Sequence, residues 1–285
     1  MPVAIVTDSN VSLPAALLKE LPIFIVPLEI HHDGKVYQDG LDLTPSAFYA
    51  LQERGPSLPT TSAPQPGAFL DAYAKAAAIA DDIVCITLSD ALSATYEAAV
   101  AAQQEASSSL PRARIQVIDS RSAGTAQGLV ALEAARLAAS GADVDAVTSA
   151  IHATLSEAYL YGYLQSLYYV WKSGRVPRVL MWMGKLLDVK PVLQLSAGKI
   201  GMVERPRTER RALKRVAALA AKAAGDAPVR VAVMHANALE RATELAEIIE
   251  DGLQPVELFV TEFTPVIGAH TGPGLVGCAL LRLPV

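Results

Sequence analysis

Three adjacent hydroxyl residues, Thr60-Thr61-Ser62, lead into Ala63 and two prolines, Pro64 and Pro66. Proline fixes φ and lacks a backbone donor, so this segment is excluded from a helix interior and from a central strand. The pattern predicts a rigid loop that ends where a helix begins, with Pro66 in the first turn. Hydroxyls beside a helix N-terminus favour an anion, because unpaired N–H groups and the helix dipole both attract negative charge. An ordinary Ser/Thr helix cap is the alternative, and this segment alone does not separate the two.

Hydroxyl-rich turns also follow three short apolar stretches that are typical of buried parallel strands. They are Thr7-Asp8-Ser9 after the run that begins at Val3, Ser89 to Tyr96 after Ile83–Leu88, and Asp119-Ser120 after Ile115–Ile118. Helical stretches separate these strands, which indicates parallel βαβ units. The carboxyl ends of parallel strands lie at one sheet edge, where open α/β sheets bind ligands. The hydroxyls are therefore expected to collect at one site.

The whole chain is predicted to form two α/β domains. Residues 1–155 form an N-terminal parallel-sheet domain, and residues 156–285 form a C-terminal mixed-sheet domain that contains a hairpin. Four local predictions bear on the site. Ser12 is predicted to cap a helix over 13–21, and Ile23–Ile30 is predicted to form one strand. His31-His32-Asp33 is expected to be an exposed hairpin turn without enough ligands for a metal, and Pro265–Gly274 is expected to be a glycine-rich loop.

The composition excludes several classes of protein. The 285 residues carry a net charge of −5, which argues against a nucleic-acid binder. No signal peptide is apparent, and the uncharged stretch Ala158–Trp171 is too short for a membrane anchor, so a cytoplasmic protein is expected. Cys85 and Cys278 lie far apart and are predicted to be buried thiols, not metal ligands. Hydrophobic residues make up 52% of the chain and mean hydropathy is +0.30, so some apolar surface can serve a purpose besides the core.

Common enzyme motifs do not account for the chain. There is no G-x-S-x-G elbow and no Walker A sequence. Gly272–Gly277 matches G-x-G-x-x-G by letter, but too few residues follow it for a dinucleotide site, so a tight turn is expected. Ser93 and His270 are candidates for a nucleophile and its base, so an esterase is an alternative function. Arg205 and Arg207 begin a basic cluster that is either a solvated helix face or a contact for an acidic partner.

Nine short motifs, spread nearly from end to end, resemble those of the DegV family, the bacterial fatty-acid-binding proteins that include the FakB subunits of fatty acid kinase. The motifs are Thr7-Asp8-Ser9, Thr61-Ser62-Ala63-Pro64, Leu92-Ser93-Ala94-Thr95-Tyr96, Val117-Ile118-Asp119-Ser120, Lys172-Ser173-Gly174-Arg175-Val176, Val189-Lys190-Pro191, Arg207-Thr208, Val266-Ile267-Gly268-Ala269-His270 and Gly272-Pro273-Gly274. Each motif is weak alone, and their order and spacing together carry the resemblance.

The resemblance implies a long-chain fatty acid bound between two domains and no other cofactor. A separate ATP-dependent kinase subunit would phosphorylate the carboxylate to an acyl phosphate. By the same resemblance, the carboxylate would bind at Thr61, Ser62, Ser93 and Ala94, with Arg175 and His270 near the head group or the phosphorylation surface. Ala63 and Ala94 depart from the family pattern, where glutamine and glycine are common.

The acyl tail would extend into the C-terminal domain. Met181, Trp182 and Met183 are candidates for its lining because methionine adapts to irregular cavities, although plain core packing is the alternative for each. Arg205 and Arg207 are candidates for partner contact. A lipid-binding protein for transport or sensing, without a kinase, is the main alternative function.

Overall fold

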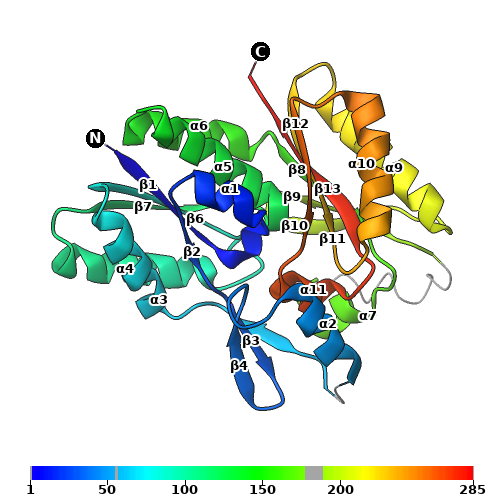
Figure 1. Cartoon of the computed structure of the whole chain (residues 1–285), viewed down its shortest axis with the longest axis horizontal. Coiled ribbons are helices and arrows are strands. Elements are labelled where there is room, and N and C mark those ends of the chain that lie inside the picture. The colour runs from blue at the N-terminus through cyan, green and yellow to red at the C-terminus, as the bar shows by residue number, and fades with distance from the viewer. Residues whose placement is uncertain (1, 55–56, 177–188, 285) are drawn as a thin grey trace.

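The computed structural model describes residues 2–54, 57–176 and 189–284, and Figure 1 shows two α/β halves side by side. The blue-to-green N-terminal half contains one sheet, and the green-to-red C-terminal half contains another. A small third sheet lies below them in this view. None of the helices in the described residues is long and apolar enough to span a membrane. The predicted fold class, two α/β units with a parallel and a mixed sheet, is confirmed.

The first sheet has four parallel strands in the order β2-β1-β6-β7. Its strands are β1 (Val3–Asp8), β2 (Ile23–Val26), β6 (Asp82–Thr87) and β7 (Arg114–Asp119). Alternate residues of β1 face opposite layers: Ala4 and Val6 pack with helices α3 (Pro66–Ala77) and α4 (Thr95–Ser109). Val3 and Ile5 pack with helices α5 (Gly124–Ala139) and α6 (Val144–Leu155). Both faces are covered, which is why the first four residues of β1, Val3 to Val6, are all apolar.

The second sheet has six strands in the order β10-β9-β8-β13-β11-β12 and is mixed, because only β11 and β12 pair in parallel. The strands are β8 (Ala158–Tyr163), β9 (Val192–Ser196), β10 (Lys199–Glu204), β11 (Val229–His235), β12 (Glu257–Glu262) and β13 (Val276–Arg282). Helices α9 (Glu209–Ala224) and α10 (Leu239–Leu253) pack on one face of this sheet.

Helix α5 lies between the two large sheets. Val130 and Ala134 pack toward the first sheet, while Ala126 and Leu129 pack against the second, so twelve of its sixteen residues are buried. Its apolar, alanine-rich sequence permits this close approach on more than one side. The predicted domain boundary at residue 155 falls in the connection between α6 and β8, and it stays a prediction.

The small third sheet is antiparallel and has the order β4-β3-β5. It consists of β3 (Glu29–His32), β4 (Lys35–Gln38) and β5 (Thr60–Ser62). The other short helices of the described residues are α1 (Ala15–Glu20), α2 (Pro45–Arg54), α7 (Tyr168–Ser173) and α11 (Pro265–Thr271), with the 3-10 turn η1 at Ser9–Val11. The Asp33-Gly34 hairpin turn is confirmed between β3 and β4.

Several local predictions were wrong, and proline explains most of them. The strand predicted over Ile23–Ile30 is two strands in different sheets, because Pro27 interrupts it. The loop predicted at Thr60 is an edge strand as far as Ser62, since Thr60, Thr61 and Ser62 lie between Pro59 and Pro64 and keep their backbone donors. Pro265 starts helix α11 where a loop was expected, and that helix ends at Gly272 with a φ of 72°.

Two further corrections concern polar residues near β1 and β3. Ser12 adopts the left-handed conformation at the end of η1, and helix α1 begins after Pro14, so Ser12 does not cap it. His31 and His32 belong to strand β3, and His32 is buried, so they do not form an exposed turn. Cys85 and Cys278 are buried free thiols, as predicted.

Candidate functional site

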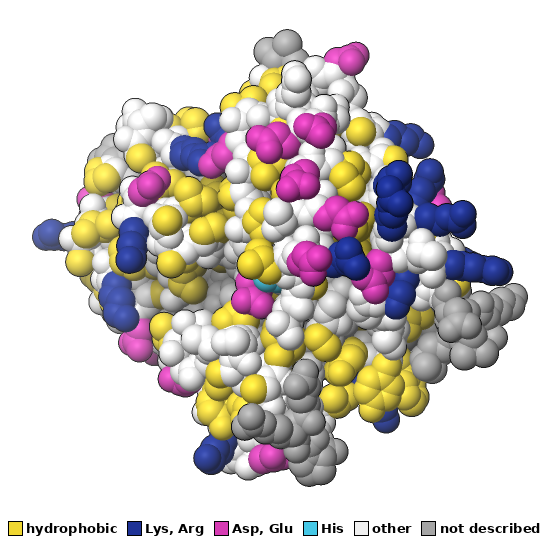
Figure 2. All heavy atoms as spheres, turned by 45° about the vertical axis from the view of Figure 1, so that its right-hand side comes forward, with side chains coloured by type: hydrophobic (Ala, Val, Ile, Leu, Met, Phe, Trp, Pro, Cys, Tyr) yellow, Lys and Arg dark blue, Asp and Glu magenta, His cyan; other side chains and the backbone are white. Residues whose placement is uncertain are grey.

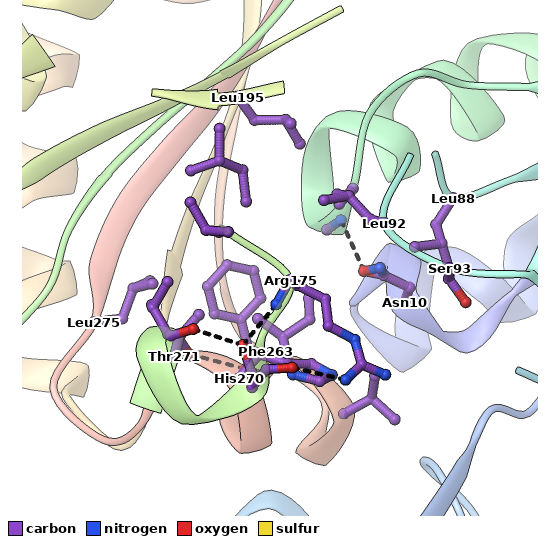
Figure 3. Close-up of a pocket in the computed structure, with 18 of the residues that line it drawn as sticks. Asn10, Leu88, Leu92, Ser93, Arg175, Leu195, Phe263, His270, Thr271 and Leu275 are labelled. Atoms are coloured by element: carbon purple, nitrogen blue, oxygen red, sulfur yellow. Dashed lines mark hydrogen bonds between the residues drawn. The ribbon is translucent and has the colours of Figure 1, made fainter. Parts of the chain in front are cut away.

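A cavity of about 180 Å³ lies between the two large sheets, and residues from both halves of the chain line it. On one side are the turns after β1 and β6 and the start of α5; on the other are β8, β9 and α11 (Figure 3). The wall is mostly aliphatic and aromatic, with Leu160, Leu193, Met234, Phe263 and Leu275 among its members. The described residues include no group of three or more potential metal ligands. A mostly apolar cavity with a few polar groups is typical of a small-molecule site.

Thr61 and His270 form the central polar pair of this cavity. Thr61 Oγ1 lies 2.7 Å from His270 Nε2, although 209 positions separate the two residues in the chain. Strand β5 presents Thr61, and the last turn of helix α11 presents His270. Burial, with a smaller effect from the positive charge of Arg175, lowers the pKa of His270 to about 4. The imidazole is therefore neutral at pH 7.

Arg175 brings a positive charge to the same end of the cavity. Its Nη1 donates to the carbonyl oxygen of Ser173 at 2.8 Å, and its Nη2 lies 3.5 Å from the carbonyl oxygen of Thr61. Arg175 lines the cavity while its side chain remains exposed. Thr61, His270 and Arg175 are thus brought together at one end of the cavity.

Ser93 lines the cavity from the turn after β6. Its Oγ is 2.8 Å from Thr95 Oγ1, and its backbone N–H donates to the carbonyl of Ser89. Ala94 is the N-cap residue of helix α4, and no side chain caps that helix. Ala94 itself is exposed and does not line the cavity. Ser93 and the start of α4 therefore form a second polar group beside the apolar wall.

The predicted roles of Ser62 and of a Ser93–His270 pair do not match the side-chain geometry. The Ser62 hydroxyl donates to Glu29 at 2.8 Å and lies 2.9 Å from His31 Nε2. Successive strand residues face opposite sides, so this hydroxyl points away from that of Thr61, although Ser62 is among the lining residues. His270 pairs with Thr61 and Ser93 pairs with Thr95, so the described residues do not form the nucleophile–base pair of an esterase.

Of the remaining predicted residues, Arg205 and Arg207 do not line the cavity. Met181, Trp182 and Met183 fall outside the described residues. Arg205 and Arg207 are exposed, directly before helix α9. The side of the molecule in Figure 2 that carries a concentration of Lys and Arg side chains also has acidic side chains beside it. On helix α9, Arg215 forms an ion pair with Glu204, and Glu209 pairs with Arg241 at 3.1 Å.

Buried carboxylates that sequence reasoning did not identify hold the cavity wall together. Asp39 accepts hydrogen bonds from Ser9 Oγ at 2.6 Å and from the N–H of Val266 at 3.1 Å, and so joins the turn after β1 to helix α11. Asp8 accepts from the N–H of Leu88 at 2.7 Å. Burial raises the pKa of both carboxyl groups to about 6 despite these hydrogen bonds. Asp8 belongs to a hydroxyl-rich turn, but Asp39 gave no recognisable pattern.

Comparison with known proteins gives consistent matches over the whole chain. The family model described as "Uncharacterised protein, DegV family" matches residues 2–283. A DegV domain-containing protein of Streptomyces coelicolor is 40% identical over 278 residues, which cover 96% of each chain.

Solved structures of similar proteins agree. A DegV family protein from Thermus thermophilus, described for its fatty acid binding, has a TM-score of 0.92 at 29% identity and covers 99% of this chain and 100% of its own. A stearic acid-binding protein from Eubacterium ventriosum has a TM-score of 0.90 at 26% identity and covers 98% of both chains. With a family model that spans nearly all of its length, this chain belongs to the DegV family.

Proposed function

We propose that this protein binds a long-chain fatty acid, with the carboxylate at Thr61 and Ser93 and the tail along the apolar cavity wall. One observation carries the proposal: a cavity between the two sheets joins an aliphatic wall to the Thr61–His270 pair. The description of similar structures as fatty acid-binding proteins supports the same ligand class.

The energetics assign different tasks to the wall and to the polar groups. A sixteen-carbon chain has about fourteen methylenes, each contributing about 0.8 kcal/mol when buried, so the tail supplies up to about 11 kcal/mol. A hydrogen bond to a charged group contributes about 1.5–3 kcal/mol. The tail therefore sets most of the affinity, and the polar groups fix which end of the ligand lies at Thr61.

The Thr61–His270 bond prepares the threonine hydroxyl for an anion. Because His270 is neutral, only one ring nitrogen carries a proton, and Nδ1 has no hydrogen-bond partner among the described residues. In the tautomer with the proton on Nε2, the imidazole donates to Thr61 Oγ1. The Thr61 hydroxyl hydrogen is then free to point at a carboxylate, and the donation strengthens it as a donor.

The N-terminus of helix α4 supplies a second favourable feature. The helix runs for fifteen residues from Thr95, directly after Ser93, and no side chain caps it. Its unpaired N–H groups and its dipole stabilise negative charge near Ser93. Ala63 also lines the cavity, but its methyl side chain has no amide group, so the side chain adds no hydrogen bond to the head group.

We further propose that the protein presents the bound carboxylate to a separate ATP-dependent kinase subunit. A carboxylate oxygen would attack the γ-phosphorus of ATP, forming acyl phosphate and releasing ADP. The exposed Arg175 beside the Thr61 backbone is the group placed to meet the incoming phosphates, since guanidinium pairs well with phosphate oxygens. Arg205 and Arg207 are exposed and available for contact with an acidic region of the partner.

Two measurements test these proposals. Native mass spectrometry of the purified protein should show a bound fatty acid, and failure to find or to bind any fatty acid would refute the first proposal. Mixing the loaded protein with ATP and a cognate kinase subunit should yield acyl phosphate. Arg175→Gln should slow this step at least tenfold while fatty acid binding persists, and Arg112→Gln, at another exposed arginine, should not. Fatty acid binding without acyl phosphate would favour transport or sensing.

A further inference from the structure

Asn10 is a polar residue in the cavity wall that the head-group proposal does not use. It follows strand β1, is only 4% exposed, and lines the cavity. Its Oδ1 accepts a hydrogen bond from the backbone N–H of Gly124 at 3.0 Å. Gly124 is the first residue of α5, whose N-cap residue Ala123 makes no side-chain bond, so the Asn10 carbonyl takes the place of a cap.

This bond fixes which way the Asn10 amide points. With Oδ1 held by Gly124, the Nδ2 group lies on the other side of the amide, and Figure 3 shows this side chain reaching toward the pocket from η1. Among the described residues Nδ2 has no hydrogen-bond partner. Within this described part of the chain, the Nδ2 atom is unpaired but not fully enclosed by protein, and Asn10 lines the cavity, so this donor is accessible from the cavity. Asn10 thus offers a free donor inside a mostly apolar cavity.

Neighbouring contacts locate this donor along the cavity. A methyl group on Gly124 would lie 3.1 Å from the ring of Phe263 and 3.5 Å from Ile267, both of which line the opposite wall. Ile267 is three residues before His270 on helix α11, or about 4.5 Å along the axis. An extended chain advances by roughly 1.2 Å per bond, so that distance corresponds to about four bonds of an alkyl chain. Asn10 therefore faces the first few carbons of the ligand, not its far end.

A plain alkyl chain leaves the Asn10 donor without an acceptor, whereas an oxygen at this position satisfies it. We propose that the cavity prefers acyl chains that carry an oxygen substituent, such as a hydroxyl, within a few carbons of the carboxylate, and that Asn10 Nδ2 donates to that oxygen. The carboxylate itself has other donors at Thr61 and Ser93. This inference rests on the proposed function. The hydrogen bond from Asn10 Nδ2 to the substituent oxygen should raise the affinity for the substituted acid by about 2- to 12-fold over the plain acid.

The first experiment compares ligands with the unchanged protein. Dissociation constants are measured by calorimetry for hexadecanoate, 3-hydroxyhexadecanoate and 16-hydroxyhexadecanoate on delipidated protein. The 3-hydroxy acid should bind about 2- to 12-fold more tightly than hexadecanoate, and the 16-hydroxy acid should not. Equal binding of the first two acids would overturn the inference and leave the proposed function intact. Binding of none of them would refute the proposed function instead.

The second experiment uses Asn10→Leu, which has nearly the same shape and no donor. Hexadecanoate should bind as tightly as before or more tightly, because an unpaired amide no longer faces the chain, while the preference for the 3-hydroxy acid disappears. The loss of the helix cap alone would lower the melting temperature without removing the preference for the 3-hydroxy acid. Weaker binding of both acids by the same factor would show that Asn10 donates to the carboxylate, contrary to the inference. If this variant fails to fold, the ligand comparison still decides.

Discussion

The replacement Thr61→Val is the sharpest test of the head-group assignment. Valine has the shape of threonine and suits a strand, so β5 should keep its pairing with β3. The change removes the hydroxyl that would bind the carboxylate and that contacts His270 Nε2 at 2.7 Å. Since the apolar tail contacts are unchanged, the loss should be confined to the polar end of the ligand.

Its magnitude follows from the kind of bond removed. A hydrogen bond to a charged group contributes about 1.5–3 kcal/mol, which corresponds to about a 10- to 150-fold rise in the dissociation constant. Most of the tail's contribution remains, so binding should weaken but stay measurable. The nearly buried imidazole of His270 loses its partner as well, so a decrease of about 1–3 kcal/mol in the free energy of unfolding should accompany the change.

Calorimetric titration of delipidated protein with hexadecanoate is the appropriate assay. The matched control is Thr60→Val, at the adjacent position on the same strand, where the side chain is exposed and does not line the cavity. This control should bind as the unchanged protein does. A dissociation constant within twofold of the unchanged value in Thr61→Val would show that the carboxylate binds elsewhere.

Three further predictions concern stability. Gly277→Ala drives a methyl group into the carbonyl oxygen of Tyr161 and should lower the free energy of unfolding by about 1–3 kcal/mol or more. Gly67→Ala, which meets no atom within 4 Å, should not lower it, and equal urea midpoints for the two variants would refute the close approach. Burial raises the pKa of Asp39 to about 6, so the contribution of this carboxyl group to folding stability is complete below pH 3.8 and is lost as pH rises through about 6. Unfolding free energies measured across this range should show about 3 kcal/mol of pH dependence that is missing in Asp39→Asn. Parallel curves for the two proteins would contradict this. Glu257→Gln should lower the free energy of unfolding by about 1 kcal/mol at low salt and by less in 1 M salt, because it breaks the partly exposed bidentate ion pair with Arg136. A loss that does not depend on salt would contradict this.

Local patterns determined most of the architecture. The strands predicted at Val3, at Ile83–Leu88 and at Ile115–Ile118 are observed as β1, β6 and β7. Because parallel strands end at a common edge, the same patterns also predicted that the turn holding Ser93 would face a ligand cavity. The family resemblance singled out Thr61 and His270. Each of these inferences depends on information within a few residues of the chain, or on motifs already known.

Tertiary structure decided which side chains meet. The sequence could not show that Thr61 contacts His270 across 209 positions, or that the hydroxyl of Ser62 turns toward Glu29, because both depend on the register of β5 with β3 and on the docking of α11. The free amide of Asn10 likewise exists only because Gly124 occupies its carbonyl. Local propensity selects helices and strands, whereas long-range packing fixes the direction of each polar group and thereby the chemistry of the cavity.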